Sequence, residues 1–236
     1  KPPKASKLAR VKLKKDADNA VSGVPAGQEF HLHRQAQSQR ARVLGMVLIE
    51  FDADYGVDLR RAPDAKQACA EAWGVPGEDA RPSVASLREL MGVISAHEWR
   101  KKGVEIAALG KAPNNRIHPH YGVFSPVRGE YVDLVANAPL PASPGSKFVA
   151  FDIGTGTGVL SAVLALRPEV DQVVATDLDP RALVCARENI YRLRLPNPVK
   201  VMEADLYPEG LASVIVCNPP WLPARPGSPL EGAVYD

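Results

Sequence analysis

From residue 147 onward, short apolar runs alternate with helical patterns, and this alternation restricts the fold more than any other feature of the chain. The helical patterns are GVLSAVLALR (158–167) and DPRALVCARENIYRLRL (179–195), the second with Asp179 as candidate N-cap and Pro180 in its first turn. The apolar runs are KFVAFDIG (147–154), QVVATDLD (172–179), VKVMEADLYP (199–208) and SVIVCNPP (213–220). Strands that alternate with helices predict a doubly wound, mostly parallel α/β sheet, which binds ligands at the carboxyl ends of its strands.

The N-terminal part of the chain has a different pattern. Residues 1–15 contain seven basic residues and no acidic residue, so this tail is either simply solvated or a nucleic-acid-binding arm. Residues 34–50, 62–75 and 83–99 have apolar groups at helical spacing and predict helices. Residues 101–126 mix short apolar runs with Gly, Pro and Asn, which predicts hairpin-like or irregular structure.

Bulk properties restrict the class of protein. The 236 residues are 45% hydrophobic and 24% charged, which is typical of a globular domain. A net charge of +2 does not by itself indicate a nucleic-acid or membrane partner, and no apolar run approaches the ~20 residues of a membrane span. The three cysteines lie far apart, which predicts a reducing, cytoplasmic compartment. Because the first residue is Lys1, we expect that the chain is not a complete gene product.

A glycine-rich loop follows the first of these strands. The segment FDIGTGTGVLS (151–161) places Gly154, Gly156 and Gly158 between a strand and a helix. Glycine lets the backbone approach a ligand closely, and the helix start offers free N–H donors. A dinucleotide fingerprint needs Gly or Ala three residues after Gly156, where this chain has Val159. The loop therefore favours a nucleotide that is bound through something other than a pyrophosphate.

Acidic residues stand at the ends of three successive strands. Asp152 lies in the first strand, Asp177 ends the second and Asp205 ends the third. A carboxylate at Asp177 can accept hydrogen bonds from both hydroxyls of a ribose, and Asp205 can accept one from an adenine amino group. Because parallel strands end at the same edge of a sheet, we expect these groups to meet there.

With these motifs the chain resembles the class I S-adenosylmethionine-dependent methyltransferases. The resemblance rests on DIGTGTG, ATDLDPRAL, EADLYP and NPPW, and covers about residues 145–223. It implies a Rossmann-like sheet whose last strands we expect beyond this chain, and S-adenosyl-L-methionine as cofactor. The implied cofactor-binding residues are Asp152, Gly154, Thr155, Gly156, Gly158, Asp177, Leu178, Ala204, Asp205 and Asn218.

The NPPW motif, Asn218 to Trp221, predicts how the methyl acceptor is held. An amide or exocyclic amino nitrogen has a delocalised lone pair and is a poor nucleophile, so acceptors on its N–H groups help to orient it. The Asn218 side-chain oxygen and the Pro219 carbonyl suit this role, Pro220 stiffens the turn and Trp221 can stack on the flat group. These four residues are our candidate catalytic residues. No metal is needed for this chemistry, and the pairs HLH (31–33) and HPH (118–120) offer only two ligands each.

The layout ahead of the first strand resembles HemK-like glutamine methyltransferases, which methylate translation release factors. Where that family has Pro-Arg-Pro-Glu-Thr-Glu, this chain has SPVRGEYVDL (125–134). The resemblance implies three parts: a basic tail over 1–27, a smaller, mainly helical substrate-recognition domain over 28–108, and an S-adenosylmethionine-binding methyltransferase domain over 109–236. It implies a monomeric N-methyltransferase acting on a macromolecule, with a protein glutamine as first choice.

Three alternatives stay open at this point. One is an RNA or DNA methyltransferase that acts on an exocyclic amino group of adenine or guanine. A nicotinamide-dependent oxidoreductase is disfavoured by Val159 and has no use for NPPW. A binding domain with a degenerate cofactor fold is disfavoured because the motifs are intact.

Overall fold

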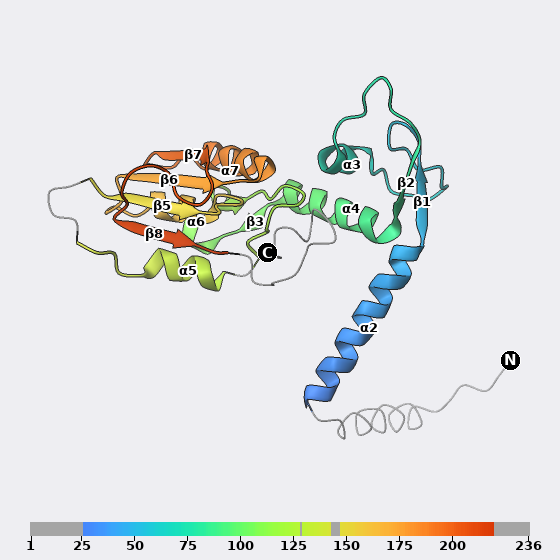
Figure 1. The fold of residues 1–236 in the computed structure, drawn as a ribbon, viewed down its shortest axis with the longest axis horizontal. Coiled ribbons are helices and arrows are strands. Elements are labelled where there is room, and N and C mark those ends of the chain that lie inside the picture. The colour runs from blue at the N-terminus through green and yellow to red at the C-terminus, as the bar shows by residue number, and fades with distance from the viewer. Residues whose placement is uncertain (1–25, 128, 143–146, 220–236) are drawn as a thin grey trace. The chain divides into compact units, whose positions relative to one another are not determined.

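A computed structural model of the chain describes residues 26–127, 129–142 and 147–219. It divides into two compact units, Lys1–Ile49 with Val84–Glu89, and Glu50–Ser83 with Leu90–Asp236. The elements (Figure 1) are α2 (Ala26–Met46), β1 (Leu48–Phe51), α3 (Lys66–Trp73), β2 (Ser83–Ser86), α4 (Leu87–Lys102), β3 (Val104–Glu105), the 3-10 helix η1 (Ala107–Leu109), β4 (Arg116–Ile117), α5 (Glu130–Asn137), β5 (Val149–Ile153), α6 (Val159–Ala165), β6 (Gln172–Asp177), α7 (Pro180–Leu193), β7 (Val199–Glu203) and β8 (Val214–Cys217).

The predicted parallel sheet is confirmed. Strands β7, β6, β5 and β8 lie side by side in that order, and all three pairings are parallel (Figure 1). Each strand falls within one of the apolar runs that predicted it, and β5 is central because its run is buried almost throughout. The first strand, β5, thus lies between β6 and β8. The chain passes from β5 to β6 through α6 and from β6 to β7 through α7. The carboxyl ends of all four strands therefore point to the same edge.

One face of this sheet packs against helices. Ala150 of β5 and Val173 of β6 are fully buried and share a cluster with Leu164 of α6. The cluster that holds Val163 of α6 also includes Val132 of α5. Apolar side chains of α5 and α6 therefore hold the sheet and its glycine loop in place.

Helix α7 begins as the sequence predicted. The Asp179 side chain accepts a hydrogen bond from the backbone N–H of Arg181 at 2.9 Å, and Pro180 occupies the first turn. Such a cap satisfies an N–H that the helix itself leaves without a partner. The start of α7 is thereby fixed directly after β6, and this brings Asp177 and Asp179 to the same strand end.

The N-terminal helical prediction is partly wrong. Residues 48–50 and 83–86, which we expected to be helical, lie in the strands β1 and β2, and these pair with each other in a two-stranded sheet. Local spacing favoured helices, but the two short apolar runs gain hydrogen bonds by pairing over a long sequence separation. The Ser86 hydroxyl then accepts from the N–H of Glu89 at 3.1 Å and caps the start of α4.

The hairpin-like segment is confirmed, since β3 and β4 pair antiparallel, with Val104 opposite Ile117. The expected boundaries at 27/28 and 108/109 stay predictions. Within the described residues, every helix is too short or too polar to cross a lipid bilayer.

Candidate functional site

A cavity of about 570 Å³ opens at the carboxyl edge of the parallel sheet. The three strand-end aspartates Asp152, Asp177 and Asp205 all line it. The remaining lining residues are Gly122, Val123, Phe124, Tyr131, Ile153, Gly154, Thr155, Gly156, Thr157, Val159, Leu160, Leu178, Asp179, Ala182, Ala204, Leu206, Cys217, Asn218 and Pro219. The structure therefore brings together nearly all the residues that the sequence singled out. Of the predicted site residues, Gly158 is absent from the lining, and Pro220 and Trp221 lie outside the described residues.

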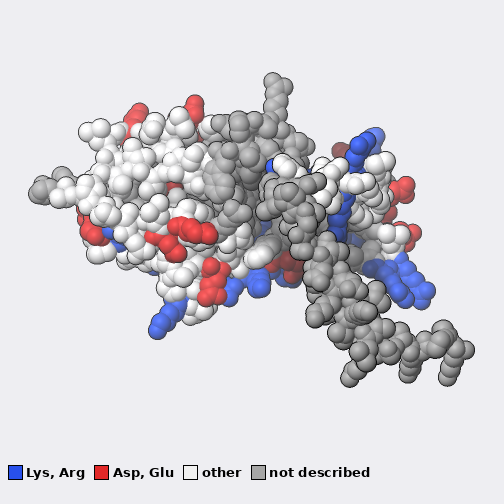
Figure 2. Space-filling view, turned by 90° about the horizontal axis from the view of Figure 1, so that it is seen from below, with Lys and Arg blue, Asp and Glu red and all other residues white. Residues whose placement is uncertain are grey.

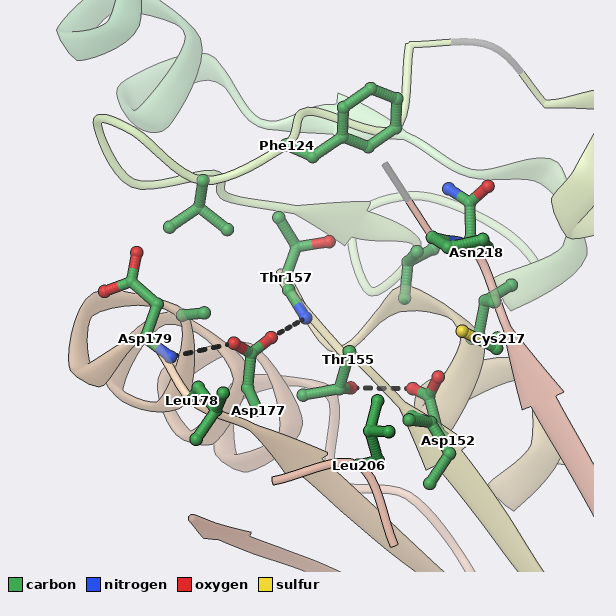
Figure 3. Close-up of a pocket in the computed structure, with 18 of the residues that line it drawn as sticks. Phe124, Asp152, Thr155, Thr157, Asp177, Leu178, Asp179, Leu206, Cys217 and Asn218 are labelled. Carbon is green, nitrogen blue, oxygen red and sulfur yellow. Dashed lines mark hydrogen bonds between the residues drawn. The ribbon is translucent and has the colours of Figure 1, made fainter. Parts of the chain in front are cut away.

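Asp177 organises one end of the cavity. One carboxylate oxygen accepts from the N–H of Gly156 at 2.9 Å and the other from the N–H of Asp179 at 3.0 Å (Figure 3). The side chain thus connects the glycine loop with the start of α7. A carboxylate has about four acceptor positions, so both oxygens keep capacity for ligand hydroxyls.

Two leucines give this end an apolar surface. Leu178 follows Asp177, and Leu206 follows Asp205 with a positive φ of 65°. The Thr176 hydroxyl fixes this turn by donating to the Leu206 carbonyl at 2.8 Å. Both leucines are 58% exposed, and Figure 3 shows them across the cavity from Phe124. Apolar side chains beside a few polar groups form a slot that suits a flat heterocycle.

Asp152 is buried at the other end of the cavity. One of its oxygens accepts from the hydroxyls of Thr155 and Ser161, each at 2.6 Å, and from the N–H of Ser161 at 3.0 Å. Burial raises the pKa of this carboxyl above its usual value, and the hydrogen bonds from Ser161 and Thr155 oppose that rise. Thr155, which we predicted to bind the cofactor, lines the cavity and directs its hydroxyl to Asp152.

The segment before α5 forms another wall, and α7 anchors it. Asn189 is buried, accepts from the N–H of His118 at 2.8 Å, and donates to the Thr157 carbonyl at 3.1 Å. His120 is joined to Glu188 at 2.9 Å. These bonds hold Gly122, Val123 and Phe124 against the cavity.

Asn218 and Pro219 follow β8 and line the same cavity as Asp152. Cys217, the last residue of β8, is exposed and lines the cavity, since alternate residues of this strand are exposed. Partial burial and then the nearby Asp152 charge raise the pKa of its thiol, so the thiol stays protonated. Within the part of the chain that the structure describes, no group of three or more His, Cys, Asp or Glu could hold a metal ion.

Gly154 and Gly158 differ in what surrounds them. Both have positive φ, 67° and 80°. A Cβ at Gly158 would lie 3.3 Å from the Cα and Cβ of Ala186 in α7, whereas a Cβ at Gly154 would meet nothing within 4 Å. Gly158 therefore serves close packing of the α6 start on α7, and Gly154 leaves space in the cavity lining.

We predict different effects for alanine at these two positions, mainly on stability at Gly158 and mainly on ligand binding at Gly154. Gly158→Ala should lower the free energy of unfolding by about 2 kcal/mol or more, because left-handed strain and overpacking add. Gly154→Ala keeps the strain but not the clash, so it should cost less stability and should weaken nucleotide binding instead. Denaturant unfolding and calorimetric titration of both variants check this, and equal stability losses would contradict it.

The lining fits S-adenosylmethionine as a ligand. The four charged lining side chains, Asp152, Asp177, Asp179 and Asp205, are all acidic, and no Lys, Arg or His is among the described lining residues. Such a lining favours a ligand that carries positive charge, here a sulfonium and an ammonium group, and disfavours a pyrophosphate.

Comparison with known proteins agrees with the class of methyltransferases that the sequence resembles. Residues 114–226 match the family model described as "Methyltransferase small domain". Over these residues, slightly less than half of the chain, it is similar to this methyltransferase family.

Three curated relatives each match about a third of this chain. A release factor glutamine methyltransferase from Moorella thermoacetica is 38% identical over 37% of this chain and 33% of its own. A tRNA1(Val) (adenine(37)-N6)-methyltransferase from Histophilus somni is 37% identical over 30% of this chain and 32% of its own. A ribosomal protein L11 methyltransferase from Symbiobacterium thermophilum is 42% identical over 32% of this chain and 24% of its own. The chain thus spans about a quarter to a third of the length of these relatives.

Among solved structures, the N-terminal domain of human METTL16 in complex with SAH aligns with 68% of this chain and 66% of its own, at 19% identity and a TM-score of 0.31. The α/β fold described above is established by the strand order of this chain and does not depend on this likeness.

Proposed function

We propose that this protein is an N-methyltransferase that acts on a planar amide or amino nitrogen, with the side-chain amide of a protein glutamine as its substrate. The observation that carries the proposal is the position of Asn218 and Pro219 in the lining of the same cavity as the strand-end aspartates. A substrate nitrogen that is hydrogen-bonded to these two residues would lie directly beside the cofactor.

The chemistry follows from these groups. The bound cofactor supplies an electrophilic methyl group, and transfer leaves S-adenosylhomocysteine. The Asn218 side-chain oxygen and the Pro219 carbonyl accept hydrogen bonds from the two N–H groups of the substrate. These two bonds orient the nitrogen so that its lone pair points at the methyl carbon. They also stabilise the positive charge that the nitrogen gains as the N–C bond forms and the S–C bond breaks. The methylated nitrogen then loses its proton to water, so Asn218 need not act as a base.

The two ends of the cavity take different parts of the cofactor. Asp177 accepts hydrogen bonds from the ribose hydroxyls and Asp205 accepts one from the adenine amino group, while Leu178, Ala204 and Leu206 lie against the adenine ring. Asp152 and the loop from Gly154 to Gly156 take the amino-acid tail. These roles are supported by the positions of all these residues in one cavity lining.

A protein substrate is supported by the release factor relative, whose match extends over 93 residues. It is also supported by the surface, because acidic and basic side chains are interspersed over the described face in Figure 2, without a continuous basic area there. We further propose a macromolecular partner, a monomeric state and a reducing, cytoplasmic compartment, in keeping with Cys69, Cys185 and Cys217 all being free.

An RNA amino group is the second candidate. The tRNA adenine-N6 relative and the seven basic residues within 1–15 favour it. The full chain is incubated with methyl-labelled cofactor and a cell extract, and each sample is divided between protease and ribonuclease. We expect protease-sensitive label, with methylglutamine after proteolysis. Ribonuclease-sensitive label would transfer the assignment to RNA, and no label in either fraction would contradict both.

We predict that binding of S-adenosylhomocysteine tightens as the pH rises through the raised pKa of Asp152. The raised pKa means that the free protein holds this carboxyl protonated above its usual range. The ligand ammonium favours the ionised form, so binding releases a proton and the affinity grows with pH until Asp152 is ionised in the free protein.

Calorimetric titrations between about pH 5 and 7 check this, because the ligand's own ammonium and carboxylate keep their charges there. The Asp152→Asn variant should lose the pH dependence, whereas Asp171→Asn, which alters a carboxylate at the start of β6, should keep it. A pH dependence that persists in Asp152→Asn would contradict the assignment.

A further inference from the structure

Tyr131 is a cavity residue that no motif marked. It lies in the first turns of α5, is partly buried, and its ring packs against the apolar cluster around Val132 and Val159. It nonetheless lines the cavity, together with Asp152 and Leu160. Its ring is therefore held by packing, while the residue as a whole contributes to the wall at the Asp152 end.

At the Asp152 end of the cavity, the lining described so far provides no hydrogen-bond donor for the carboxylate of the cofactor. The cofactor's amino-acid tail carries an ammonium and a carboxylate. Asp152 can accept from the ammonium, but a carboxylate placed near Asp152 needs a hydrogen-bond donor, because two anions in a low-dielectric cavity repel each other. No cationic side chain is among the described lining residues, so the donor has to be neutral.

The two hydroxyl groups that contact Asp152 are already engaged. Thr155 and Ser161 both donate to Asp152 itself, each at 2.6 Å. No hydrogen bond joins the Tyr131 hydroxyl to another described residue. Burial, and then the Asp152 charge, raise the pKa of Tyr131 to about 12, so the phenol keeps its proton at neutral pH and remains a donor.

We propose that the Tyr131 hydroxyl donates a hydrogen bond to the carboxylate of the cofactor's amino-acid tail, beside the ammonium held by Asp152. The inference rests on the proposed function, because it assumes an S-adenosyl ligand in this cavity. It makes Tyr131 a ligand-binding residue that balances an otherwise acidic lining.

The experiment compares two ligands that differ only in this carboxylate. S-adenosylhomocysteine and its decarboxylated analogue are titrated calorimetrically into the full chain and into Tyr131→Phe, which keeps the packed ring. We expect Tyr131→Phe to weaken S-adenosylhomocysteine about tenfold, roughly 1.4 kcal/mol, and to leave the analogue within about twofold. For the unaltered chain, the analogue should already bind more weakly than S-adenosylhomocysteine.

The matched control is Tyr191→Phe, at a residue of α7 that is 88% exposed. It should change neither affinity. Equal weakening of both ligands by Tyr131→Phe, or no weakening of either, would overturn the inference. If Tyr131→Phe failed to fold, equal binding of the two ligands by the unaltered chain would still overturn it. Absence of any S-adenosylhomocysteine binding by the unaltered chain would instead contradict the proposed function.

Discussion

Asn218→Ala is expected to reduce methyl transfer by about a hundredfold or more while changing the affinity for S-adenosylhomocysteine by no more than about threefold. The reason is that the side-chain oxygen is assigned to the substrate N–H groups and gains its importance as charge develops on the nitrogen. The residue lies at the cavity end that Asp152 and Cys217 share, away from the nucleoside end at Asp177 (Figure 3).

Single-turnover rates and calorimetric titration measure the two quantities on the same sample. Asn137→Ala serves as the matched control, because Asn137 is an exposed asparagine at the end of α5 that bonds only locally, to the Asp133 carbonyl. Its rate should equal that of the unaltered chain. A loss of cofactor affinity with an unchanged turnover of bound cofactor would show that Asn218 belongs to the cofactor site instead.

Asp177→Ala is expected to have the opposite pattern. Loss of a hydrogen bond to a charged group amounts to roughly 1.5–3 kcal/mol, which is about a 10- to 150-fold weaker affinity for S-adenosylhomocysteine. The structure places the effect toward the upper end, because the carboxylate also holds the N–H groups of Gly156 and Asp179. Removing it loosens the glycine loop and the start of α7 together.

Asp171→Ala controls for the loss of a structural carboxylate. Asp171 precedes the same strand at its other end, where its side chain accepts from the N–H of Phe148 at 2.7 Å. Both variants should lower the melting temperature, but only Asp177→Ala should weaken the ligand. Equal ligand affinities in the two variants would mean that Asp177 has a structural role alone.

The sheet could be predicted because its signals are local. Three of the strands have an acidic residue at or near the carboxyl end, Asn218 follows the fourth, and the start of α7 is marked by Asp179 and Pro180 next to each other. These signals predict the order of elements along the chain, and because the strands are parallel, their carboxyl ends meet at one edge. For this reason the sequence alone could predict that four residues lie close together, namely Asp152, Asp177, Asp205 and Asn218.

The rest depends on contacts across the sequence. Strands β1 and β2 had no local signal that distinguished them from helix, because each exists only through its partner. Tyr131 and Phe124 reach the cavity because Asn189, more than sixty residues further along the chain, holds the preceding segment at His118. Gly158 looked like a ligand contact, and only the distance to Ala186 shows a packing reason for it.

Calorimetric titration of the full chain with S-adenosylhomocysteine and, separately, with NAD tests the central claim most directly. The described lining is acidic and includes no Lys, Arg or His. We therefore expect the chain to bind S-adenosylhomocysteine at one site and to give no heat with NAD at the same concentration. Binding of NAD without binding of S-adenosylhomocysteine would contradict the account.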